Sequence, residues 1–239
     1  MLGQQITRQE LFARLAQGHA AGITVLTPNR RLALALKAQF DAVQSNSGLA
    51  LWEDADILPY GAFVQRLHED AAYADAAGDM AQLLTPAQER RLWETVLEGA
   101  PLLAVADTAA DCAAAWRLAH AWRIEGAAFS ETVKFPGNED TQTYARWARE
   151  YAKRCAAGGF TDTARLPDLV VAVARARQLV AYGFDILPPQ ARDFLGAAVL
   201  ECRPERITAS NGKVSFPSAR QELEAAARRA RTRLETGRQ

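Results

Sequence analysis

Apolar residues along this chain follow two patterns, short β-branched runs and longer stretches with the spacing of a helix. Residues 23–28 form the first short run and predict a buried strand. A helical stretch follows, marked by Leu32, Leu36, Phe40 and Val43. Residues 54–67 repeat this order, with a short extended stretch before a helix, and strand character returns at 177–184. Because strands joined by helices form parallel sheets, we expect residues 23–27 and 178–184 to lie side by side and parallel.

Capping signals predict where several helices begin. Thr7 and Glu10 form a capping box before a first helix, and Thr27-Pro28 is expected to open the second. A turn at 185–189 leads into another helix at Gln190. Further caps are predicted at Thr85-Pro86, Asp107-Thr108, Asn138 and Ser218.

The middle of the chain is almost wholly helical in pattern and rich in alanine. Four tryptophans on these helices are expected to pack in the interior, namely Trp93, Trp116, Trp122 and Trp147. A β-hairpin is predicted around Asn211-Gly212. We therefore expect an α/β core at 1–67 and 177–217, a helical insertion at 68–176, and the start of a truncated following domain at 218–239. The chain is then the N-terminal part of a longer protein.

Composition limits the classes of partner. The 28 basic and 28 acidic side chains cancel, so any site for a polyanion must be a local patch. Cys112, Cys155 and Cys202 are odd in number and far apart, which is typical of a reducing compartment and not of disulfides or zinc. No apolar run approaches the length of a membrane span, and the N-terminus lacks the apolar core of a signal peptide. We expect a cytoplasmic protein with no membrane partner.

Catalytic motifs are missing from the chain. A P-loop needs Gly-Lys followed by Ser or Thr, but Val214 follows the only such pair, Gly212-Lys213. No lysine has a carboxylate two positions before it, as nucleases of the Asp…(Asp/Glu)-x-Lys kind require. The histidines are isolated and are expected to be surface or core residues, namely His19, His68 and His120. The sequence therefore predicts no catalytic residue, no metal site and no cofactor in this chain.

Three segments together resemble a family of DNA-processing proteins. They are Thr27-Pro28-Asn29-Arg30-Arg31 after the first strand, residues 57–67, and residues 180–195. In order and spacing they are similar to the N-terminal half of the AddB/RexB type of helicase–exonuclease subunit. They look closer still to the proteobacterial "probable DNA repair protein" relatives of that type. The resemblance implies a P-loop-NTPase-like (helicase-like) parallel sheet core that has lost its Walker motifs, with an exodeoxyribonuclease domain beyond this chain.

The resemblance also assigns roles to single residues. Residues 27–31 match the family's first DNA-contacting loop, and Tyr60 lies within the place of a Thr-Phe-His stretch of active relatives. Asp185 occupies a degenerate Walker B position, where Ile186 stands instead of the glutamate that would follow. The missing carboxylate agrees with a core that does not hydrolyse ATP. The implied partners are DNA, in single-stranded form and contacted through its backbone, and a helicase–nuclease partner subunit.

Physical chemistry supports part of this interpretation and leaves alternatives open. A helix that opens at Thr27-Pro28 offers free backbone N–H groups, and Arg30 and Arg31 add donors suited to phosphate, although both could simply be solvated. Tyr60 could stack on a base or could pack in the interior. We expect a non-catalytic part of a DNA repair or recombination machine that guides DNA and scaffolds the complex. The alternatives are a divergent ATP-dependent helicase or nuclease subunit with an unrecognised ATP site, and a helical protein–protein scaffold.

Overall fold

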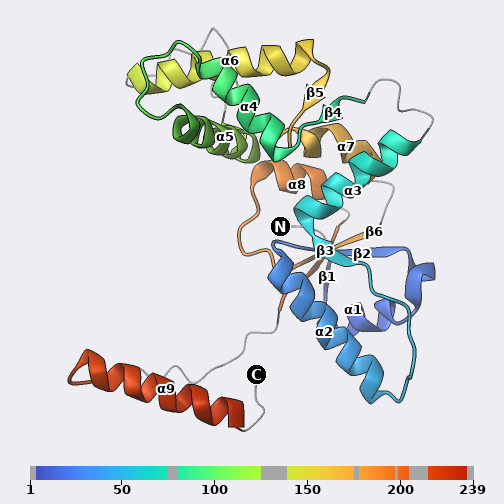
Figure 1. Cartoon of the computed structure of the whole chain (residues 1–239). Coiled ribbons are helices and arrows are strands. Elements are labelled where there is room, and N and C mark those ends of the chain that lie inside the picture. The colour runs from blue at the N-terminus through green and yellow to red at the C-terminus, as the bar shows by residue number, and fades with distance from the viewer. Residues whose placement is uncertain are drawn as a thin grey trace. The chain divides into compact units, whose positions relative to one another are not determined.

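The computed structural model describes residues 4–74, 80–124, 139–174, 178–196, 199–204 and 215–235. Its contacts divide the chain into two compact units, residues 1–204 and residues 205–239. The first unit holds an α/β core and an inserted group of helices (Figure 1). None of the helices in the described ranges has the length and apolar character needed to cross a lipid bilayer.

A five-stranded, wholly parallel sheet forms the α/β core, in the order β1-β7-β6-β2-β3. The strands are β1 Gln5–Ile6, β2 Ile23–Thr27, β3 Ile57–Pro59, β6 Gln178–Tyr182 and β7 Leu200–Cys202. Strands β2 and β6 pair from Ile23 with Gln178 to Leu26 with Ala181, which confirms the expected parallel neighbours. The sequence interpretation missed β1 and β7, because two or three residues are too few to show a strand pattern.

Helices cover both faces of this sheet (Figure 1). One face carries α1 Arg8–Leu15 and α2 Arg30–Asn46, and the other carries α3 Tyr60–Tyr73, α7 Leu166–Ala174 and α8 Pro189–Leu195. Neighbouring strand residues point to opposite faces: Val25 packs with α1 and α2, whereas Leu26 packs with α3, α7 and α8. The expected α/β layering is therefore present, and α7, which fell within the predicted insertion, packs over the sheet.

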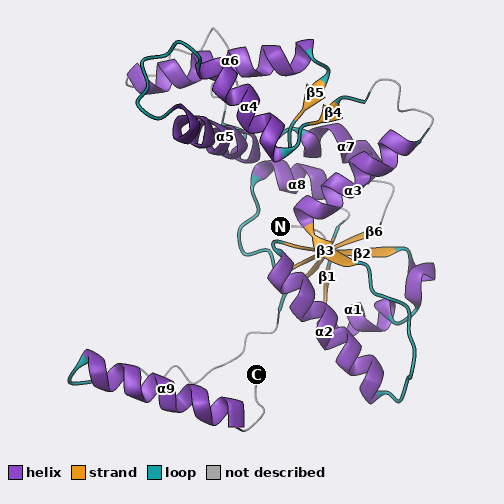
Figure 2. Ribbon diagram, in the orientation of Figure 1, coloured by secondary structure: helices purple, strands orange, loops and turns teal. Residues whose placement is uncertain are grey.

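The insertion contains helices and a small parallel sheet (Figure 2). Its elements are β4 Gln82–Leu83, α4 Pro86–Leu97, α5 Val105–Trp122, α6 Glu139–Ala157 and β5 Phe160–Thr161. The sequence predicted helices alone, because strands this short leave no periodic signal. Trp93 and Trp116 are buried as predicted, but Trp122 is 45% exposed, so the interior packing expected for Trp122 was wrong.

The capping box expected at the start of α1 and the cap expected at Thr85-Pro86 before α4 are both confirmed. Helix α2 begins later than expected, because Thr27 remains in β2, paired with Pro59, and its hydroxyl donates to the carbonyl of Asn29. Asn29 is the N-cap instead, and its side chain accepts from the N–H of Leu32 at 2.9 Å.

Three other predictions concern the start of α5, a cap at Asn138 and a hairpin near the end of the chain. Helix α5 begins at Val105 with Ala104 as its N-cap, so Asp107 lies inside the first turn and the cap predicted at Asp107-Thr108 was wrong. An acidic residue still suits that turn, since the helix dipole is positive there. Asn138 and the hairpin around Asn211-Gly212 lie outside the described residues.

A buried carboxylate joins the helices of the insertion. Asp162 is 1% exposed, and its Oδ2 accepts hydrogen bonds from Trp116 Nε1 at 3.1 Å, Tyr151 Oη at 3.3 Å and Arg165 Nε at 3.0 Å. Its Oδ1 accepts from the backbone N–H groups of Ala164 and Arg165. Because both carboxylate oxygens are fully hydrogen-bonded and a guanidinium lies beside them, the buried charge is compensated. Asp162 thereby fixes α5 and α6 to the turn that precedes α7.

His120 lies beside this network, near the end of α5. Its ring meets the Trp116 ring edge-on at a centroid distance of 4.4 Å, and its Nε2 is buried with no hydrogen-bond partner among the described residues. Burial lowers the pKa of His120, because the charged form loses its hydration.

The lowered pKa of His120 predicts weaker folding in mild acid. A histidine of the unfolded chain binds its proton near pH 6.5, whereas folded His120 binds it at a lower pH. The unfolded state therefore takes up more protons, and the free energy of unfolding falls as the pH drops below about 6.5. The free energy of unfolding, measured with urea between about pH 7 and 5, should fall less steeply with decreasing pH in His120→Asn than in the parent. The exposed His19→Asn serves as the control, and equal slopes in all three proteins would contradict the prediction.

The second unit contains α9 Ala219–Glu235. Glu224 pairs with Arg220 and Arg228 at helical spacing along its surface. Leu223 is 71% exposed, so its side chain is not covered by the described residues of the unit.

Candidate functional site

The carboxyl ends of the parallel strands meet at one edge of the sheet, where open α/β sheets bind their ligands. The neighbouring strands β2, β6 and β7 end there at Thr27, Tyr182 and Cys202. We call the residues that follow them, Asn29–Arg31, Gly183–Asp185 and Arg203-Pro204, the carboxyl edge. The structure thus brings the predicted residues Asn29, Arg30 and Arg31 to the same edge as Asp185.

The first turn of α2 presents two adjacent arginines at the carboxyl edge. Arg30 and Arg31 are both exposed, and neither side chain pairs with a carboxylate within the described part of the chain. Their backbone N–H groups lie in the first turn, where a helix has no internal acceptors. The guanidinium groups, the free N–H groups and the positive end of the helix dipole therefore favour an anion at the same place.

Gly183 allows the strand ends to approach α2 closely. Its φ of +72° lies in the left-handed region, and a Cβ added there would lie 2.6 Å from Leu32 Cδ2 and 3.3 Å from Pro204 Cγ. A methyl group there would therefore require the Leu32 side chain in the first turn of α2 to shift. A glycine at the end of a strand was the sequence signal for this contact, but its partners could not be read from the sequence.

Two charged residues complete the carboxyl edge. Asp185 is exposed, two positions beyond Gly183. Arg203 follows β7, and its Nε donates to Glu201 Oε1 at 2.8 Å while most of its side chain stays exposed. The sequence interpretation missed Arg203 because β7 itself was not recognised.

Tyr60 has a different environment from the predicted arginines. It begins α3, its ring meets Phe194 edge-on at 5.3 Å, and its hydroxyl is buried with no hydrogen-bond partner among the described residues. Burial raises the pKa of this hydroxyl. Of the two roles that the sequence allowed, this geometry favours interior packing over base stacking.

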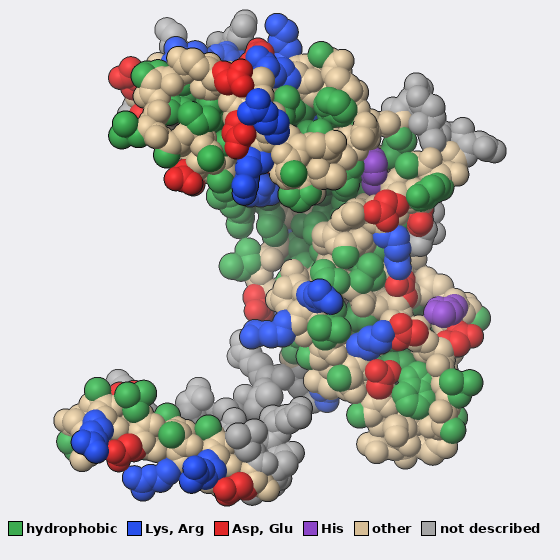
Figure 3. Space-filling view, in the orientation of Figure 1, with side chains coloured by type: hydrophobic (Ala, Val, Ile, Leu, Met, Phe, Trp, Pro, Cys, Tyr) green, Lys and Arg blue, Asp and Glu red, His purple; other side chains and the backbone are tan. Residues whose placement is uncertain are grey.

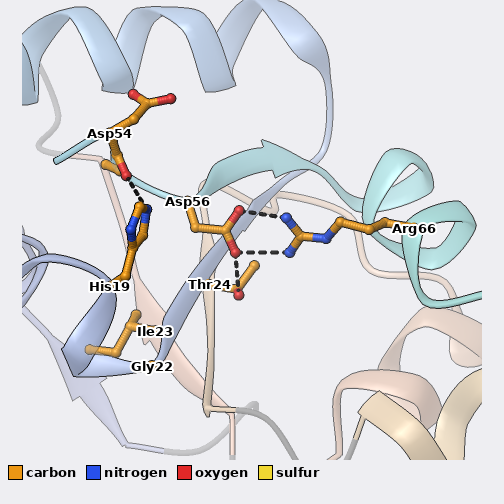
Figure 4. A pocket seen from close by; sticks show the side chains of 8 residues that line it. His19, Gly22, Ile23, Thr24, Asp54, Asp56 and Arg66 are labelled. Carbon is orange, nitrogen blue, oxygen red and sulfur yellow. Dashed lines mark hydrogen bonds and ion pairs between the residues drawn. The ribbon is translucent and has the colours of Figure 1, made fainter. Parts of the chain in front are cut away.

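The opposite edge of the sheet, where β2 and β3 begin, carries a cavity of about 430 Å³. Figure 4 shows Asp56 between Thr24 and Arg66 in this amino-edge cavity. The carboxylate of Asp56 accepts two hydrogen bonds from the Arg66 guanidinium, at 2.7 and 2.8 Å, and one from the Thr24 hydroxyl at 2.6 Å. This network ties β2 to the segment before β3 and to α3.

Other charges near the amino-edge cavity are paired within the protein as well. His19 Nε2 lies 3.0 Å from the carbonyl oxygen of Asp54, and Lys37 Nζ lies 2.6 Å from the Asp54 carboxylate. We therefore assign this cavity a structural role. Sequence reasoning missed the network because its members are spread over residues 19–66 without motif spacing.

The candidate chemistry of the α/β core is therefore anion binding at the carboxyl edge. Across the described ranges, no cluster of three or more His, Cys, Asp or Glu side chains is arranged to hold a metal ion. Compared with known proteins, the sequence matches no family model and no curated protein.

The Gly183 contact predicts a large loss of stability in Gly183→Ala. The new methyl group would meet Leu32 in addition to the strain of a positive φ. Gly99→Ala is the matched control, because Gly99 has a φ of +83° and nothing within 4 Å of an added Cβ. We expect Gly183→Ala to lower the free energy of unfolding by at least about 1 kcal/mol more than Gly99→Ala does. If both variants lose the same free energy of unfolding in urea, the contact of Gly183 with Leu32 does not contribute to stability.

Proposed function

We propose that this chain is a non-catalytic, DNA-binding part of a repair or recombination machine of the AddB/RexB helicase–nuclease type. It contacts the DNA backbone through the carboxyl edge of its sheet and scaffolds the complex with its helical insertion. The observation that carries this proposal is the pair of exposed arginines, Arg30 and Arg31, at the start of α2. Paired guanidinium donors at a helix N-terminus suit phosphate oxygens.

The topology of the core supports the resemblance that motivates this proposal. A parallel sheet with helices on both faces, and a large insertion between β3 and β6, agrees with a helicase-like core. Only Thr7 separates β1 from α1, and its hydroxyl caps the helix by accepting from the N–H of Glu10. A P-loop needs about eight residues between its strand and its helix. This tight turn supports a core that does not hold a nucleotide triphosphate.

The distribution of charge supports a local contact with a polyanion. Figure 3 shows basic and acidic side chains interspersed over the visible face of the first unit, in keeping with the zero net charge. Attraction to DNA must then come from a few placed groups rather than from a broad basic surface. Binding of single-stranded DNA is expected to be weak, independent of sequence and sensitive to salt.

Replacing Arg30 and Arg31 together by Ala tests the proposed backbone contact. Loss of up to two phosphate contacts should reduce the slope of log affinity against log salt by roughly one to two units. Fluorescence anisotropy with a single-stranded oligonucleotide at three salt concentrations, from about 50 to 200 mM, measures the slope. The control is Arg90→Ala with Arg91→Ala, an adjacent exposed pair in α4, of which Arg91 pairs with Glu94 and Glu98.

Other results of this titration would exclude the proposal. An unchanged slope in the Arg30 and Arg31 variant would remove the site, and absence of DNA binding by the parent would favour a protein–protein scaffold. A loss of thermal stability in this variant would show instead that the arginines support the fold. A melting curve of each variant distinguishes a loss of the DNA contact from a loss of fold stability.

The lack of room for a P-loop predicts that the chain does not hydrolyse ATP, with or without single-stranded DNA. Phosphate release should stay at the level of a buffer blank across the fractions of a final gel-filtration step. ATP turnover that follows the protein peak through that step would favour the alternative of a divergent motor.

A further inference from the structure

A second cavity lies where the α/β core meets the insertion, between α3 and the segment formed by β4 and the start of α4. Its volume is about 590 Å³, within the range of roughly 300–1,000 Å³ typical of small-ligand sites. Its apolar lining includes Met80, Leu83 and Pro86. We call this cavity the α3 groove. Pockets between two parts of a fold, with an apolar lining and a few polar groups, are common ligand sites.

An exposed aromatic ring stands at the α3 groove. Tyr73, the last residue of α3, is 92% exposed and lines the cavity. It differs from Tyr60, whose ring packs against Phe194. An aromatic ring left in solvent beside a cavity offers a face on which a planar ligand ring can stack.

Hydrogen-bond acceptors on α3 line the same groove. Gln65 Nε2 donates to Glu69 Oε1 at 2.9 Å, which leaves Gln65 Oε1 and Glu69 Oε2 as acceptors one helical turn apart. No Lys or Arg is among the described residues that line the groove. The groove therefore suits a group that donates N–H bonds and does not suit a phosphate.

His68 also belongs to the lining of the groove and ties α3 to the segment before β4. It is 6% exposed, and its Nε2 lies 3.0 Å from the carbonyl oxygen of Ala81. Because a carbonyl can only accept, Nε2 donates this hydrogen bond.

We infer that the α3 groove binds a planar nitrogen heterocycle that carries an amino group, as adenine and cytosine do. The ring stacks on Tyr73, and the amino group donates to Glu69. A uracil ring presents a carbonyl oxygen in place of the amino group, so at that position it would face the carboxylate without a hydrogen bond, and only its ring N3–H could donate to Glu69. The inference does not depend on the proposed DNA contact, because it concerns the base and not the phosphate.

Free nucleosides test the α3 groove, since they lack the phosphate that the carboxyl edge would bind. Saturation-transfer NMR should show binding of adenosine and cytidine at concentrations of roughly 1 mM, and at least roughly tenfold weaker binding of uridine. Tyr73→Ala should weaken adenosine binding roughly tenfold, whereas Tyr73→Phe keeps the ring and the affinity. Glu69→Gln should weaken cytidine binding, and Glu139→Gln, an exposed change in α6, should not.

Three results would overturn the inference: no nucleoside binds at roughly 10 mM, uridine binds as well as cytidine, or Tyr73→Ala and Glu69→Gln bind as the parent does. The test is separate from that of the DNA contact. Arg30→Ala with Arg31→Ala should leave nucleoside binding unchanged. If the salt slope responds to the arginines while no nucleoside binds, the groove is refuted and the backbone contact stands.

Discussion

The parallel pairing of β2 with β6 joins residues 23–26 to residues 178–181 at the centre of the sheet. The chain between the two strands adds β3 at one edge and must then cross over and return to the sheet in the same direction. These strands are buried on both faces, so their ladder is protected from water. Parallel pairing also places the carboxyl ends of both strands at the same edge. The first turn of α2 therefore lies beside Gly183, although the two are far apart in the sequence.

Polar side chains fix the insertion to the helices that cover the sheet. Arg123, which ends α5 with a φ of +51°, donates to Asp168 in α7 at 2.6 and 2.9 Å and to Asp193 in α8 at 3.3 Å. Gln190 Nε2 adds bonds to Asp168 and to the carbonyl of Ala164. The exposed ion pairs are screened by water and contribute modestly, whereas the buried Gln190 amide leaves a larger penalty if its partners are lost. The polar junction thus fixes geometry more than it adds stability.

Sequence patterns predicted those parts of the fold that are long enough to be periodic, such as β2, α2, α3 and β6. They failed at β1, β4, β5 and β7, which are held by backbone pairing rather than by a side-chain pattern. The residues of the candidate site also differ in whether the sequence alone could predict them. Arg30 and Arg31 could be proposed from a helix start, but Arg203 depends on an unrecognised strand and the contact of Gly183 with Leu32 depends on tertiary packing. In the sequence alone, Tyr73 and Glu69 are ordinary residues of a helix surface. Only the fold shows that they line a cavity with the segment 80–86.

The two edges of the sheet differ because the connections of a parallel sheet give its helices one direction. Helices α1, α2 and α3 begin within three residues of the strands that precede them, so their N-termini gather at the carboxyl edge. Their positive dipole ends make that edge attractive to anions in a chain whose formal charges cancel. At the amino edge, by contrast, Lys37 and Arg66 are each paired with an aspartate. Arg30 and Arg31 therefore stand where the backbone field already favours an anion, which is why two arginines are enough to define a site there.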